Sequence, residues 1–145
     1  MECSKDSRNA AVVALASLLF MPIGEVARAE EAKKEATTVK QLMTQDLAGI
    51  PGKEVVMLTV EYVPGGSSLP HRHDADVFVY VLEGSIVTQV DGQEPVTLKA
   101  GETFHESPTD VHRKSANASS SQPAKFLVVM VKDKGKPATR PVDQK

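Results

Sequence analysis

The sequence is poor in the features that mark several common classes of protein. Its 145 residues include one cysteine, Cys3, so no disulfide can form within the chain, and the fold must be stabilised by an apolar core or a bound metal. The longest apolar run, residues 10–20, is shorter than the roughly 20 residues of a membrane-spanning helix. The formal charge is −2, and the one basic cluster, "KDKGK" at residues 132–136, is interrupted by Asp133. We interpret this cluster as part of a solvated tail and expect no nucleic-acid partner.

The first 29 residues have the pattern of a secretory signal peptide. Basic side chains in "MECSKDSRNA" precede the apolar run "AVVALASLLF", and Ala27 and Ala29 form the A-x-A pattern of a cleavage site. We expect cleavage after Ala29, which would remove Cys3 and leave a periplasmic or secreted protein with no membrane attachment. An uncleaved anchor is the competing interpretation, but Pro22 and Gly24 follow the short apolar run.

The rest of the chain divides into a linker, one β-rich domain and a tail. Residues 30–36, "EEAKKEA", are charged and lack large apolar side chains, as expected for a linker. Residues 37–131 contain short runs rich in Val, Thr, Tyr and Phe between glycine and proline turns, which is typical of an all-β sandwich or barrel. The strands expected are residues 37–43, 54–63, 67–73, 77–83, 85–90, 95–100, 102–106, 111–117 and 124–131. Residues 132–145, with Pro137 and Pro141, are expected to lie along the surface or to be disordered.

All four histidines of the chain lie between residues 71 and 112. In an extended strand, residues i and i+2 point to the same face, so His71 and His73 would present two imidazoles side by side. Such a pair chelates zinc, iron, copper or nickel, although an isolated H-x-H is also common as two surface histidines. His112 follows a proline-containing turn, "SPTDV", and starts another short run. A later hairpin could therefore bring a third imidazole to the first pair.

The spacing around the first two histidines resembles the first motif of the cupin family. That motif places H-x-H and a glutamate between two glycines, and its glycine and histidine positions correspond here to Gly65, His71, His73 and Gly84. The position of the glutamate is occupied by Val77, which cannot coordinate a metal. Val77 continues the apolar parity of Val79 and Val81, so we expect its side chain to point inward.

A second cupin motif follows in the right order. It consists of a glycine, a proline-containing turn, a histidine and an asparagine, matched more loosely here by Gly101, Pro108, His112 and Asn117. The resemblance covers about residues 50–131. It implies an all-β fold, a double-stranded β-helix or jelly-roll-like barrel, in which His71, His73 and His112 bind a divalent metal between two sheets. It also implies a homodimer, for which the outward parity of Phe78, Tyr80 and Leu82 gives some support.

The missing glutamate leaves three hypotheses open. In the first hypothesis the site is a neutral three-histidine centre, similar to the iron centres of cupins that cleave β-diketones or oxidise thiols with dioxygen. In the second a different carboxylate substitutes, and Glu106 is the best candidate, either as a fourth ligand or as a partner that orients an imidazole. Asp74 and Asp76 are near in sequence but fall on the opposite strand parity. In the third hypothesis the metal is lost and only the scaffold remains.

The remaining aromatic side chains have simpler interpretations. His105 has opposite parity to Glu106, so we expect it on the surface or at a dimer contact. Phe78, Tyr80, Phe104 and Phe126 are expected to pack in the core or at a dimer interface, whereas the role of Tyr62 is open.

The function expected from this resemblance is that of an exported, metal-binding cupin. The first candidate is an O₂-dependent dioxygenase acting on a small enolisable or aromatic compound, with iron as the favoured metal and zinc, manganese, nickel or copper as other choices. The alternative is a non-catalytic periplasmic module that binds zinc or a small ligand in the same pocket. One fold can carry many activities, so the choice between the dioxygenase and the binding module depends on the residues and geometry of the metal site.

Overall fold

The computed structural model describes residues 37–142, and the predicted signal peptide and linker lie outside this range. Strands and turns account for all of the secondary structure in it, so it holds no helix long and apolar enough to cross a membrane. The strands are β1 (Thr37–Asp46), β2 (Lys53–Tyr62), β3 (Ser67–Ser68), β4 (His71–Arg72), β5 (Ala75–Glu83), β6 (Ser85–Val90), β7 (Val96–Lys99), β8 (Thr103–Glu106), β9 (His112–Asn117), β10 (Ala124–Asp133) and β11 (Arg140–Pro141).

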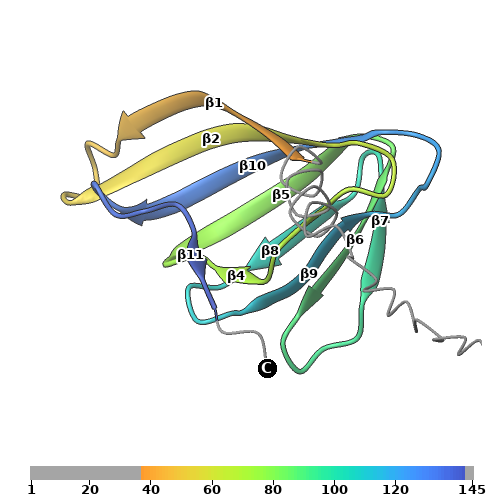
Figure 1. Ribbon diagram of the computed structural model, residues 1–145. Helices are drawn as coiled ribbons and strands as arrows, with labels where there is room; N and C mark the ends of the chain where they lie inside the picture. Colours follow the sequence, from red (N-terminus) through yellow and green to blue (C-terminus); the bar gives the residue numbers. More distant parts are fainter. Residues whose placement is uncertain (1–36, 143–145) are drawn as a thin grey trace, which may run out of the picture.

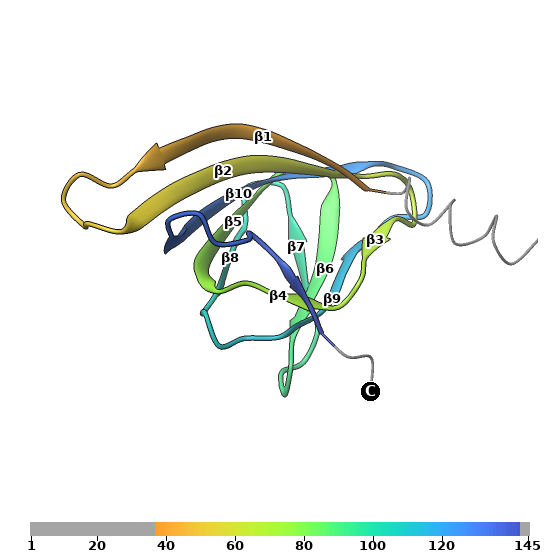
Figure 2. The ribbon, with the colours of Figure 1, turned by 60° about the vertical axis from the view of Figure 1, so that its left-hand side comes forward.

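Two antiparallel sheets face each other and enclose the core (Figures 1 and 2). The first sheet has the order β1-β2-β10-β5-β8. The second has the order β11-β4-β9-β6-β7, and β3 pairs with β9 as well. Strands distant in sequence therefore lie side by side, which is the wrapped arrangement expected of a jelly-roll-like barrel.

The core follows from the two-residue period of the strands. Along β5, Val77, Val79 and Val81 are buried, whereas Phe78 and Tyr80 between them are exposed on the outer face. Strands β2 and β10 alternate in the same way, and β2, β5 and β10 contribute equally to the core. The predicted inward parity of Val77 is confirmed, because its side chain is only 1% exposed.

The turn from β5 to β6 depends on a glycine. Gly84 has a φ of 70°, and a Cβ at this position would lie 2.5 Å from the carbonyl oxygen of Pro123. Any larger residue would combine an unfavourable backbone conformation with a collision against main chain. This close approach explains why the last glycine of the first motif is needed here.

Two predicted strand boundaries are wrong for identifiable reasons. The strand expected over residues 67–73 is divided into β3 and β4, because Pro70 between them has no N–H to donate to a ladder. The first strand was expected to end at residue 43 but continues to Asp46, pairing with β2 along its length. Most of β1 is exposed, so apolar alternation does not mark its end.

The tail expected to start at residue 132 is also more ordered than predicted. Residues 132–133 belong to β10, and Arg140 and Pro141 form β11 against β4. Lys132, expected to be solvated, is instead buried and pairs with Glu54 across the ladder from β10 to β2. Its ammonium group also donates to the carbonyl of Lys136 at 2.6 Å, and the chain then continues to β11 in the second sheet. The hydrogen bond from Lys132 lowers the pKa of Glu54, so the pair is an ionic one.

Candidate metal site

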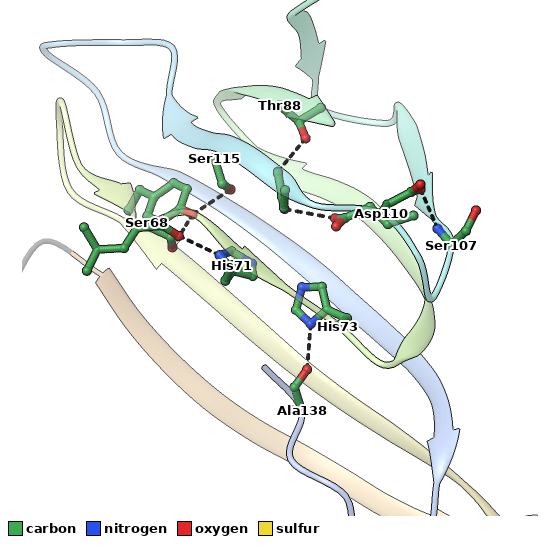
Figure 3. A network of polar contacts seen from close by, with 12 residues as sticks. Ser68, His71, His73, Thr88, Ser107, Asp110, Ser115 and Ala138 are labelled. Carbon is green, nitrogen blue, oxygen red and sulfur yellow. Dashed lines mark hydrogen bonds and ion pairs between the residues drawn. The ribbon is translucent and has the colours of Figure 1, made fainter. Parts of the chain in front are cut away.

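Three imidazoles converge between the two sheets. His71 lies in β4, His73 follows that strand directly, and His112 begins β9, where it pairs with His71 in register. One nitrogen from each ring can be chosen so that all three lie within 4.8 Å of one another. Figure 3 shows His71 and His73 side by side in the space between the sheets. The predicted convergence of the three imidazoles is therefore confirmed.

Main-chain carbonyls fix the orientation of the first two rings. Nδ1 of His71 lies 2.7 Å from the carbonyl oxygen of Leu69, and Nδ1 of His73 lies 2.6 Å from that of Ala138 (Figure 3). A carbonyl oxygen only accepts, so both Nδ1 atoms carry the proton and both Nε2 atoms keep a lone pair for a metal. Burial also lowers the pKa of His71, which favours its neutral form.

The third ring has a different set of neighbours. Nε2 of His112 is hydrogen-bonded to the hydroxyl of Thr88 at 2.8 Å. Its Nδ1 lies 3.1 Å from Oε1 of Glu106, which is within ion-pair distance. The N–H direction does not meet that oxygen, however, and among residues 37–142 this buried nitrogen has no hydrogen-bond partner. The two atoms are therefore close without a hydrogen bond between them.

Glu106 is the carboxylate that faces the three imidazoles. It lies in β8 directly opposite Val77 of β5, and both side chains point into the space between the sheets. Burial alone would raise the pKa of Glu106, but the imidazoles of His112, His73 and His71 outweigh burial and lower it. Its carboxyl group is therefore ionised at neutral pH.

The two aspartates near the histidine pair point elsewhere. Asp74 pairs with Arg140 and Asp76 with His105, and all four side chains are substantially exposed. Of the carboxylates considered from the sequence, Glu106 alone lines the cavity, within the part of the chain that the structure describes.

The imidazoles and Glu106 line a small cavity of about 120 Å³. This is about four times the volume of one water molecule, so the space suits a metal ion with a small ligand. Tyr62, whose role was left open, closes one side, and its hydroxyl is hydrogen-bonded to Ser68 and Ser115 at 2.7 Å each. Burial raises the pKa of Tyr62, so its hydroxyl keeps its proton. The remaining walls are mostly apolar and come from β1, β2, β5 and β10: Val39, Leu58, Val60, Val77, Val79, Phe126, Val128 and Met130.

The other aromatic side chains lie close to where the sequence places them. His105 is 49% exposed and packs against Phe78 on the outer face of the first sheet, with ring centroids 5.0 Å apart. Tyr80 is exposed on the same face, whereas Phe126 belongs to the core and Phe104 packs against it. Thr88, Ser115 and the carbonyl of Ala138 were not identified from the sequence.

Comparison with known proteins assigns the family. The sequence model of the family described as the cupin domain matches residues 58–130, which is half of the chain. The chain is a cupin. Among curated proteins none matches the sequence.

Many solved structures share this fold. The polyketide cyclase RemF from Streptomyces resistomycificus is 27% identical with a TM-score of 0.58, over 77% of the cupin and 74% of the cyclase. An oxalate oxidase bound to glycolate is 24% identical with a TM-score of 0.56, over 72% and 54% of the two chains. The DMSP lyase DddQ from Ruegeria pomeroyi is 16% identical with a TM-score of 0.59, over 74% and 52%. The cupin thus spans about half the length of the last two proteins, and the similarity to them shows the fold alone.

The residues of the cavity fit a divalent metal. Two rings present Nε2 lone pairs that main-chain carbonyls hold in place. The third has a buried nitrogen that finds no hydrogen-bond partner within residues 37–142, and an ionised carboxylate lies beside it. Imidazole and carboxylate groups of this kind are accepted by iron, zinc, manganese, nickel and copper. His71, His73 and His112 could therefore hold the ion, as the family resemblance implies.

Proposed function

We propose that this cupin is an exported metalloprotein that binds a divalent ion through His71, His73 and His112. We further propose that it acts as an O₂-dependent dioxygenase on a small enolisable or aromatic compound, with iron as its metal. The observation that carries the proposal is the convergence of three buried or half-buried imidazoles, two of which have their tautomer set by carbonyls. Surface histidines would have no such orientation.

The surroundings of the imidazoles support a small, mainly apolar substrate. The cavity of about 120 Å³ is lined mainly by apolar side chains on the first sheet, where Tyr62 and Glu106 are the polar exceptions, and by polar side chains on the second. A flat, apolar molecule bound between the sheets would exclude water from the imidazoles, whereas a sugar would leave several hydroxyls without partners. The hydroxyl of Tyr62 stays protonated and lies 2.7 Å from two serine hydroxyls, so it donates to an oxygen atom of a substrate either when both serines donate to it or when it releases the serine to which it donates.

A bound iron would supply the activation of dioxygen, which no side chain of the cavity can provide. The contribution of the chain is to hold and orient the imidazoles, to keep the cavity small and to provide one ionised carboxylate, Glu106.

Metal analysis of freshly purified protein, combined with oxygen uptake in the presence of small β-diketones and catechols, tests the proposal. Stoichiometric iron and substrate-dependent oxygen consumption are expected. Stoichiometric zinc without turnover would instead support the non-catalytic binding module. Absence of any metal after reconstitution would reject the dioxygenase and the zinc-binding form of that module.

A further inference from the structure

We propose that the carboxylate of this metal site has moved from β5 to β8, so that Glu106 is a fourth, direct ligand and His112 coordinates through Nδ1. The inference rests on the proposed metal binding and specifies its coordination. It concerns two contacts that a three-histidine site does not explain: the approach of Glu106 to Nδ1 of His112, and the hydrogen bond from Nε2 of His112 to Thr88.

The hydrogen bonds of His112 favour one tautomer in the presence of a metal. If Nδ1 carried the proton, a buried N–H group would point past the carboxylate of Glu106 without a hydrogen bond, which buried donors rarely do. If Nε2 carries the proton, it donates to the hydroxyl oxygen of Thr88 at 2.8 Å, and Nδ1 presents a lone pair. That lone pair then faces an anionic oxygen, an arrangement that a cation bound by both atoms would stabilise.

The separation of the two atoms fits such a shared cation. Metal–nitrogen and metal–oxygen bonds of about 2.0–2.2 Å place two ligands roughly 3.0 Å apart at a right angle and roughly 3.4 Å apart at the tetrahedral angle. Nδ1 of His112 and Oε1 of Glu106 lie 3.1 Å apart. Both side chains are buried, and they line the same cavity as His71 and His73.

The register of the first sheet explains how the carboxylate could change strands. Val77 stands at the position of the motif glutamate, and Glu106 is its directly paired neighbour across β5 and β8. Side chains that are directly opposite in an antiparallel pair have Cβ atoms about 4.5–5.5 Å apart on the same face. A glutamate on either strand can therefore reach the same region, and the valine fills the space that the motif residue would occupy.

A competing role for Glu106 is that of a positioning residue, which would accept a hydrogen bond from Nδ1 of His112 while Nε2 binds the metal. That role requires Nε2 to leave Thr88 and the imidazole to turn. The two roles can be distinguished, because they place the metal on different nitrogens of the same ring.

The first experiment exchanges the two paired residues. Zn²⁺ affinity is measured by competition with a chromophoric chelator. The proteins compared are the wild type, Glu106→Val and the exchange variant Val77→Glu/Glu106→Val. Glu94→Gln serves as the control, because it removes an exposed carboxylate. We expect Glu106→Val to weaken Zn²⁺ binding by at least about 100-fold. Loss of a residue that only orients a ligand typically weakens metal binding by about 10–100-fold, so a loss this large indicates a direct ligand. The exchange variant should recover most of this loss, and Glu94→Gln should bind as the wild type does. Unchanged affinity in Glu106→Val, or no recovery in a folded exchange variant, would overturn the inference.

The second experiment needs no variant. Long-range ¹H–¹⁵N correlation spectra of the Zn²⁺-loaded wild type report which nitrogen of each imidazole is bound. Nε2 is expected for His71 and His73, and Nδ1 for His112. Metal-bound Nε2 in all three rings would overturn the inference while leaving the proposed function intact, whereas failure of the wild type to bind zinc, iron or manganese would overturn both.

Discussion

Replacing one buried and one exposed histidine tests whether the converging imidazoles bind a metal. His112→Ala removes a ring that lies between the sheets, whereas His105→Ala removes the same ring from the outer face, where it is 49% exposed. We expect the first change to abolish most of the stabilisation that a metal gives and the second to leave it unaltered. The quantity to compare is the shift in melting temperature on adding metal, because loss of a buried ring also lowers the stability of the metal-free protein.

The size of the shift follows from binding linkage. Metal at 100 times its Kd stabilises the folded state by about 2.7 kcal/mol, or roughly 10–20 °C for a domain of about 100 residues. If His112→Ala weakens binding about 100-fold, the same metal concentration stabilises by only about 0.4 kcal/mol, which is a shift of roughly 2–3 °C. The nitrogens lie within 4.8 Å of one another, whereas two ligands of one zinc ion lie about 3–3.5 Å apart, so part of the binding energy offsets any closure of the site that binding requires.

The assay is differential scanning fluorimetry with chelator-treated protein, with and without zinc or iron(II). A full shift in His105→Ala and a small one in His112→Ala would agree with the geometry. Equal losses in the two variants, or a full shift in His112→Ala, would refute the reasoning that only the inward-pointing ring is a ligand.

Other parts of the chain give further predictions. Gly84→Ala should lower the free energy of unfolding in urea by more than about 3 kcal/mol. Gly92 has a similar φ of 76° but nothing within 4 Å of an added Cβ, so Gly92→Ala should cost only about 1 kcal/mol. Similar losses in the two variants would contradict the collision with Pro123. Because burial lowers the pKa of His71, the metal-free protein should lose stability as the pH falls below about 6.5, and titration calorimetry or melting at several pH values would show whether it does. If the outer face of the first sheet forms a homodimer, Phe78→Glu should halve the mass found by light scattering; a monomeric wild type would reject the dimer. N-terminal sequencing of exported protein should begin at Glu30, and an intact N-terminus would reject the signal peptide.

The features predicted well from the sequence are those set by alternation along a strand. The inward direction of Val77 and Glu106 and the outward direction of His105 follow from a period of two, because a strand with one buried face has no other register available. The convergence of His71 and His112 needed a second strand, and only the resemblance to a family with a known order of motifs supplied that information.

The parts that were missed depend on main chain and on small polar side chains. The carbonyl of Ala138 orients His73 from 65 residues away, yet a carbonyl is common to every residue and has no sequence signature. Thr88 looks like any strand threonine until β6 and β9 are placed side by side. The ordering of residues after β10 depends on the burial of Lys132, and a lysine in a charged run normally predicts solvent exposure.

The contact between Ala138 and His73 makes the candidate metal site dependent on a segment that supplies no ligand. His71, His73 and His112 all precede residue 138, but the oxygen that orients His73 and the strand β11 beside His71 come from residues 138–141. A fragment ending after β10 would therefore retain all three histidines and lose the partner of Nδ1 of His73. We expect such a fragment to bind metal more weakly than the longer chain, although no ligand has been removed.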